Sequence, residues 1–194
     1  MTQTPPAGEP GGLTAEQQAT WFAYMRVALR LDFEVNHELQ AHSGLSHADF
    51  HVLNALADSP GQHLPVSDLA LRIGWERSRL SHHVLRMEKR GLVARRRADG
   101  DARVTEVALS PDGSDALQRA TPSHVELVKQ LFFDGLDPAL LAPLHRGLEQ
   151  IHDRIVLEGV LPPPPGHQTR WVDERRPVPP VGAPVADAVR RGGG

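Results

Sequence analysis

Two short amphipathic segments joined at a glycine constrain the fold of this chain more than any other feature. The first covers residues 65–73 and the second residues 77–90, and Gly74 lies between them. Glycine adopts positive φ without strain, which suits a sharp turn between two helices. The second segment places Leu80 and Met87 on one face, where they can pack against the first segment. Two short helices joined by a tight turn form a helix-turn-helix, and we predict one here.

The pattern changes directly after this pair of helices. Gly91 ends the second helix, and residues 92–97 and 104–109 then have the composition of two short strands around a turn-rich tetrapeptide. The sequence therefore predicts a β-hairpin, or wing, after the helix-turn-helix. The expected fold class is mainly α with a small β-hairpin wing, and the winged helix-turn-helix domain covers residues 46–110.

Two further helices are predicted before the helix-turn-helix. Thr14 and Gln17 form a capping-box pattern that opens a long helix to about Ala41. Ser46 and Asp49 form a second capping box, which opens a shorter helix to about residue 57. A short connection at residues 62–64 then leads into the helix-turn-helix.

Two further helices follow the predicted hairpin. Ser110-Pro111 and Asp137-Pro138 each combine a helix cap with proline at the first helical position. The first of these helices should run to about Phe133 and be kinked or interrupted by Pro122. The second has the spacing of a helix-pair seam, formed by Leu141, Leu144, Leu148, Ile151 and Ile155. Such a seam packs either within one chain or between two copies of it.

Positive charge is concentrated in the predicted helix-turn-helix and hairpin. Residues 72–103 hold ten basic and four acidic residues, a local charge of +6, although the whole chain has a net charge of −3. An acidic body with one basic face is typical of a protein attracted to phosphate through that face. The alternative is a solvated charged surface without a partner.

The basic segment has the side-chain types that read duplex DNA. The second helix would enter the major groove, where Arg bonds guanine and Ser or His bonds base edges or phosphates. An arginine of the hairpin can enter the narrow minor groove. The N-terminus of the first helix of the helix-turn-helix can hold a phosphate through the helix dipole. Leu85 also falls on this exposed side, where it would contact either a thymine methyl group or only a neighbouring helix. The predicted DNA-binding residues are Ser67, Arg77, Ser78, Arg79, Ser81, His82, Arg86, Arg95, Arg97, Asp101 and Arg103.

The chain resembles the MarR family of bacterial transcriptional regulators. The motifs that carry the resemblance are SDLALRIG, SRLSHHVLRMEKRGLVARR and DGDARVTEVALSPDG, and the order of elements extends it over residues 14–158. The resemblance implies that Arg103 reaches the minor groove and that Asp101 holds its guanidinium; a turn-stabilising ion pair is the alternative. It also implies an obligate homodimer that binds double-stranded DNA at a pseudo-palindromic operator.

The resemblance further implies a repressor that responds to a small-molecule effector. Such an effector would occupy a cleft between the dimer helices and the reading domain, and position alone suggests Met25, His37 and Phe50 as ligand-binding residues. On the same basis residues 13–45 and 111–159 form the dimerisation helices.

The two ends of the chain differ in composition from the rest. Residues 1–12 and 160–194 are rich in Pro and Gly and are predicted to be disordered tails, because they cannot bury enough apolar surface to fold. The N-terminus lacks a signal-peptide pattern, and no apolar run is long enough to cross a bilayer. We therefore expect a cytoplasmic protein without membrane contact.

Other functional classes receive less support. The chain has no cysteine, which excludes disulfides and thiolate chemistry. His47 and His51 stand at a spacing that lets two imidazoles share a metal, but local sequence supplies no complete ligand set, so no metal and no cofactor is predicted. Motifs of hydrolases and phosphate loops are missing, which disfavours an enzyme. A protein-interaction module that has lost affinity for DNA is the remaining alternative.

Overall fold

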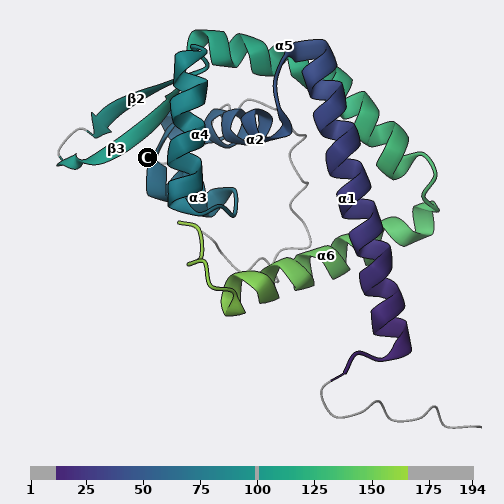
Figure 1. Ribbon diagram of the computed structural model, residues 1–194. Helices are drawn as coiled ribbons and strands as arrows, with labels where there is room; N and C mark the ends of the chain where they lie inside the picture. The colour runs from purple at the N-terminus through teal and green to yellow at the C-terminus, as the bar shows by residue number, and fades with distance from the viewer. Residues whose placement is uncertain (1–11, 99–100, 166–194) are drawn as a thin grey trace, which may run out of the picture.

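The chain folds into a winged-helix half and a layer of long helices beside it (Figure 1). The computed structural model describes residues 12–98 and 101–165. The elements in chain order are α1 (Ala15–Ser43), α2 (His47–Ala57), η1 (Pro60–Gln62), β1 (His63–Pro65), α3 (Val66–Arg72), α4 (Arg77–Lys89), β2 (Val93–Ala98), β3 (Asp101–Leu109), α5 (Pro111–Val128), η2 (Lys129–Phe133) and α6 (Pro138–Glu158). The predicted fold class is confirmed.

The helix-turn-helix is built from α3 and α4 as the apolar pattern predicted. Gly74 lies between them with a φ of 69°, the left-handed conformation that glycine adopts without strain. Leu69 of α3 and Leu80 and Met87 of α4 are completely buried. They belong to a core that also includes α2, the strands and the start of α5. Burial of a leucine or methionine side chain stabilises the fold by about 1.5–3 kcal/mol, so this core holds α4 firmly in place.

The wing is a sheet of three strands in the order β1-β3-β2. The prediction of two strands was wrong by one, because residues 63–65 form β1 instead of a plain connection. Leu64 of β1 pairs with Val107 of β3, and Val107 is fully buried. A strand of three residues is too short to show alternation, and its pairing partner lies more than 40 residues away along the chain. Local sequence therefore could not reveal it.

The capping boxes that open α1 and α2 are confirmed. The Oγ1 atom of Thr14 accepts from the backbone N–H of Gln17, and the Gln17 side chain accepts from the backbone of Thr14. Ser46 and Asp49 make the same reciprocal pair at the start of α2. Each pair satisfies backbone donors that a helix leaves open at its first turn.

The fifth helix reaches Phe133 as predicted, but its proline does not break it. Pro122 lies inside α5 and does not interrupt it. The α-helical part ends at Val128, and one π-helical turn continues the helix over residues 129–133. Flanking hydroxyls bond carbonyls of the preceding turn, from Thr121 to Leu117 and from Ser123 to Ala120. Neither hydroxyl bonds the carbonyl of Gln118, which lies four residues before Pro122 and is the group that loses its helical donor.

The last helix, α6, lies apart from the winged-helix half, below α3 and α4 in the view of Figure 1. Of its residues, all within the described part of the chain, only Asp153 is buried. The predicted seam is largely exposed to solvent, with Ile151 and Ile155 exposed by 58% and 63%. Within a single chain the seam therefore does not pack into the core. No helix in residues 12–98 and 101–165 is long and apolar enough to cross a membrane.

Candidate nucleic-acid interface

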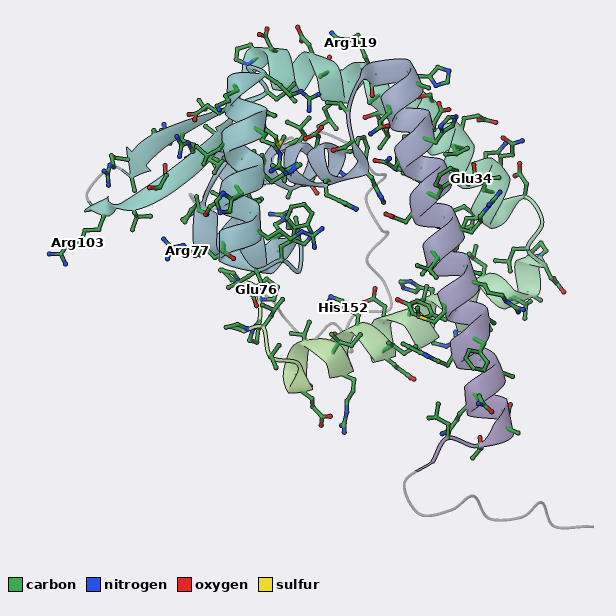
Figure 2. The ribbon with its side chains drawn as sticks, viewed as in Figure 1. Glu34, Glu76, Arg77, Arg103, Arg119 and His152 are labelled. Atoms are coloured by element: carbon green, nitrogen blue, oxygen red, sulfur yellow. The ribbon has the colours of Figure 1, made fainter. Side chains whose placement is uncertain are left out.

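The outer face of α4 is polar and exposed along its first turns. Arg77, Ser78, Arg79 and His82 are all exposed, whereas the opposite face of the helix is buried. Figure 2 shows the Arg77 side chain pointing toward the side on which the wing protrudes. The hydroxyl of Ser81 donates to the carbonyl of Arg77 at 2.8 Å, so in this chain it bonds its own helix.

Two arginines of α4 are held by aromatic or imidazole rings. The Cζ atom of Arg79 lies 4.1 Å from the ring centroid of Trp75, a cation–π contact. Nη2 of Arg86 lies 3.0 Å from Nδ1 of His83. These arginines therefore project from α4 with their directions partly set before any ligand arrives.

The wing carries basic side chains of two kinds. Arg103 is exposed and projects from the start of β3 near the tip of the hairpin (Figure 2). Arg95 instead reaches back to α4, where its Nε atom bonds Glu88 at 2.8 Å, and Arg96 bonds Glu106 at 3.0 Å across the sheet. Arg97 is exposed on the same strand. The side chain of Asp101 lies outside the described residues, so its pairing with Arg103 stays a prediction.

Two further sequence predictions concern the edges of this face. Ser67 is exposed at the start of α3, and its hydroxyl donates to Asp68 at 3.0 Å. Leu85 was expected on the exposed side of α4, but it is half-buried. It lines a cavity of about 120 Å³ between α4 and the base of the wing, together with Val66 and Thr105. Leu85 therefore faces the base of the wing, whereas sequence spacing suggested contact with a thymine methyl group or a neighbouring helix.

Sequence reasoning missed a buried polar network behind α4. Asp49, only 2% exposed, receives the Nη1 atom of Arg90 at 2.7 Å and lies 3.0 Å from Nε2 of His83. The Nη2 atom of Arg90 also donates to the carbonyl of Gly44 at 2.7 Å, the residue that ends α1. Asp49 and Arg90 together therefore connect α2 and α4 with the end of α1. Asp49 was identified only as a cap, because sequence does not show which α4 residues face it.

The environment of Asp49 changes its acidity. Burial by itself raises the pKa of this carboxyl, but the contacts with His83, Ser46 and Arg90 together outweigh burial and hold the pKa far below its ordinary value. Asp49 is therefore ionised at neutral pH and matches the charge of Arg90.

The three predicted ligand-binding residues lie in different surroundings in this chain. Phe50 is buried in the core, and its ring lies against that of His124 in a tilted arrangement at a centroid distance of 4.4 Å. His37 is exposed on α1 and stacks on Phe33. Met25 lies twelve residues before His37 on the same helix, which places the two about 18 Å apart.

A cluster of histidines occupies the junction of α1, α2 and α5. Nδ1 of His47 lies 2.7 Å from Oδ1 of Asp32, and the rings of His47 and His51 are 4.2 Å apart. Within the described part of the chain, no three His, Asp or Glu side chains converge as metal ligands. The pKa of His124 is lowered, first by burial and then by the nearby His47.

The lowered pKa of His124 predicts a loss of stability in mild acid. The unfolded chain binds a proton at this group near pH 6.5, whereas the folded chain resists it. The free energy of unfolding should therefore fall as the pH drops from above 6.5 to below the pKa of the folded state. Urea unfolding at pH 7.5 and 5.5 measures the change. It should be smaller in His124→Gln than in the wild type, and an equal change in both proteins would contradict the assignment.

A basic helix inside a helix-turn-helix, flanked by a protruding basic wing, defines a winged-helix DNA-binding protein. The sequence pattern of the MarR family matches residues 43–104. Sco3205, a MarR family transcriptional regulator from Streptomyces coelicolor solved in complex with DNA, is 35% identical, with 81% of this chain and 99% of that chain covered and a TM-score of 0.74. AbsC, from the same organism and family, is 32% identical over 75% of this chain and 98% of its own, with a TM-score of 0.70. No protein with a curated description matches the sequence.

The chain belongs to the MarR family of transcriptional regulators. The resemblance that the sequence motifs indicated is thereby confirmed, and the protein is a regulator of transcription and not an enzyme. A third similar structure, the M. tuberculosis regulator MosR in complex with DNA, is 27% identical over 69% of this chain and 96% of its own, with a TM-score of 0.56.

Proposed function

We propose that the protein is a ligand-responsive repressor that binds a pseudo-palindromic operator as a homodimer. The observation that carries this proposal is the arrangement of Arg77 and Arg103, which project toward one side of the winged-helix half (Figure 2). A helix and a hairpin tip that present cations on one side fit the adjacent major and minor grooves of a duplex.

The major-groove part of the contact is assigned to the outer face of α4. The exposed side chains of this face are those of Arg77, Ser78, Arg79 and His82. Arginine can bond guanine O6 and N7 together, which is the commonest specific contact in this groove. Ser67 and the wing residues Arg95 and Arg97 would contact phosphates at the margins, which fixes register without reading sequence.

The homodimer is supported by apolar side chains that nothing covers in the single chain. Exposed large apolar residues cluster on α1, where Trp21, Phe22 and Phe33 are more than half exposed, and on α6. Apolar surface on this scale marks an interaction site in a protein of this size. A second copy of the chain is the occupant that gives the two-fold symmetry of a pseudo-palindromic operator.

Ligand response is proposed from membership of the family. An effector acts only if it binds the DNA-competent and the DNA-incompetent states with different affinity. Met25, His37 and Phe50 stay predicted ligand contacts, and Met25 and His37 lie about 18 Å apart along α1.

The Arg103→Ala variant tests the wing contact. Operator affinity should fall by about 1–3 kcal/mol if the guanidinium reaches base edges, while the dimer remains intact. Arg119→Ala is the matched control, because it removes the same charge from an exposed position on α5 away from the wing (Figure 2). Fluorescence anisotropy with labelled operator duplex measures both. Wild-type affinity in Arg103→Ala would remove the wing from the interface.

A salt titration separates this function from a protein-interaction module. If basic residues neutralise phosphates, the logarithm of the binding constant falls linearly with the logarithm of salt concentration, because counterions are released. If the protein does not bind DNA even at low salt, the interaction module is favoured.

A further inference from the structure

His83 is a buried histidine inside the reading helix. It is 8% exposed and lies on the inner face of α4, one turn from Arg79 and Arg86 on the outer side. On one side its Nε2 atom lies 3.0 Å from Oδ1 of Asp49. On the other side Nδ1 lies 3.0 Å from Nη2 of Arg86. The imidazole therefore bridges a fixed carboxylate and an exposed arginine.

The chemistry of the two neighbours determines the role of each ring nitrogen. A guanidinium only donates hydrogen bonds, so Nδ1 of His83 must accept from Arg86. The hydrogen of the ring is then on Nε2, on the side of Asp49, where the contact has an ion-pair distance without the alignment of a straight hydrogen bond. Asp49 is itself held by Ser46 and Arg90, so the imidazole has a rigid support.

A second contact of the same ring leads to Arg79. Trp75 meets His83 edge to face, with ring centroids 5.5 Å apart and an interplanar angle of 81°. The other neighbour of the indole is the Arg79 guanidinium, 4.1 Å from the ring centroid. His83 thus supports one arginine by a hydrogen bond and the other by packing through Trp75.

We propose that His83 is a positioning residue, which orients Arg86 by accepting its hydrogen bond and supports Arg79 through Trp75, without contacting DNA itself. The inference rests on the proposed function, in which the outer face of α4 reads DNA. An exposed arginine has many rotamers, and ordering it during binding reduces affinity. Ordering it beforehand against a buried ring raises affinity for the sequence whose groups match the fixed guanidinium.

The test is the effect of Arg86→Ala in three backgrounds. In the wild type we expect Arg86→Ala to lower affinity about tenfold, the loss of one good charged contact. His83→Phe keeps an aromatic ring beside Trp75 but removes both nitrogens, so Arg86→Ala should have less than a twofold further effect there. His83→Asn places an amide oxygen close to the position of Nδ1, and the tenfold effect should return.

The binding probe is a duplex that the wild-type protein selects from a random-sequence pool. Arg77→Ala is the matched control, since no contact joins Arg77 to His83 among the described side chains, and its effect should be equal in all three backgrounds. Melting temperatures report any purely structural cost of the His83 variants, and such a cost does not change the Arg86→Ala ratio.

The outcomes separate the two claims. An Arg86→Ala effect of tenfold in the His83→Phe background overturns the positioning role and leaves the proposed function intact. If Arg86→Ala leaves the affinity of the wild type unchanged while Arg77→Ala lowers it, the positioning role is overturned, because Arg86 then does not contact DNA. A wild-type protein that selects no duplex overturns the proposed function as well.

Discussion

Replacing Ile151 by glutamate should convert the protein to a monomer and reduce its affinity for a two-half-site duplex about 100-fold or more. Ile151 is 58% exposed in the single chain and lies in the apolar seam of α6. A buried carboxylate without a partner is costly at a dimer interface, and a symmetric dimer would contain two of them. The loss of affinity follows because two linked half-site contacts bind far more tightly than one.

Sedimentation velocity measures the change in mass, and anisotropy measures the affinity. Gln150→Glu is the matched control, since it adds the same charge at the exposed neighbouring position outside the seam. It should remain dimeric. A dimeric Ile151→Glu protein with wild-type affinity would show that α6 lies outside the interface.

The Asp49→Ala variant should lose about 3 kcal/mol of unfolding free energy, because it removes a helix cap and one partner of a buried ion pair. The remaining partner, Arg90, has a side chain that is 45% exposed, so water compensates part of the cost. The pKa of Asp49 is lowered in the folded state, so its stabilising effect is complete at neutral pH and is lost only as the pH falls below the ordinary carboxyl range of about 4. The difference between wild type and variant should therefore narrow in strong acid.

Asp49→Asn separates the two contributions, since the amide oxygen can still cap α2 while the charge is lost. Urea unfolding at pH 7 should place Asp49→Asn between the wild type and Asp49→Ala. A loss below 1 kcal/mol in Asp49→Ala would contradict the claim that this carboxylate connects α2 with α4.

The helices could be predicted because their signals are local. The capping boxes at Thr14 and Ser46, and Gly74 with its positive φ, lie within a few residues of the helix ends they define. The strand β1 could not be predicted, because its only structural signal is pairing with β3. Leu85 was placed on the exposed side by helix periodicity, which does not include the wing that packs beside it.

Only the exposed residues of the candidate interface could be predicted from the sequence. Arg77 and Arg103 follow from charge, spacing and resemblance to the family. His83 did not, although its position three residues after Leu80 and four before Met87 places it on the inner face of the helix. Its significance depends on Asp49, which is 34 residues away in the chain, and on the Trp75 ring. Contacts of this kind come from tertiary packing and have no local pattern.

A footprint on the DNA that flanks the protein's own gene tests the central claim most directly. Binding of a winged-helix homodimer predicts symmetric protection over two half-sites separated by about one helical turn. Arg103→Ala should weaken protection in both halves equally, because each half-site receives the same wing. Protection of a single half-site, or no protection at salt concentrations where the dimer is intact, would contradict the account.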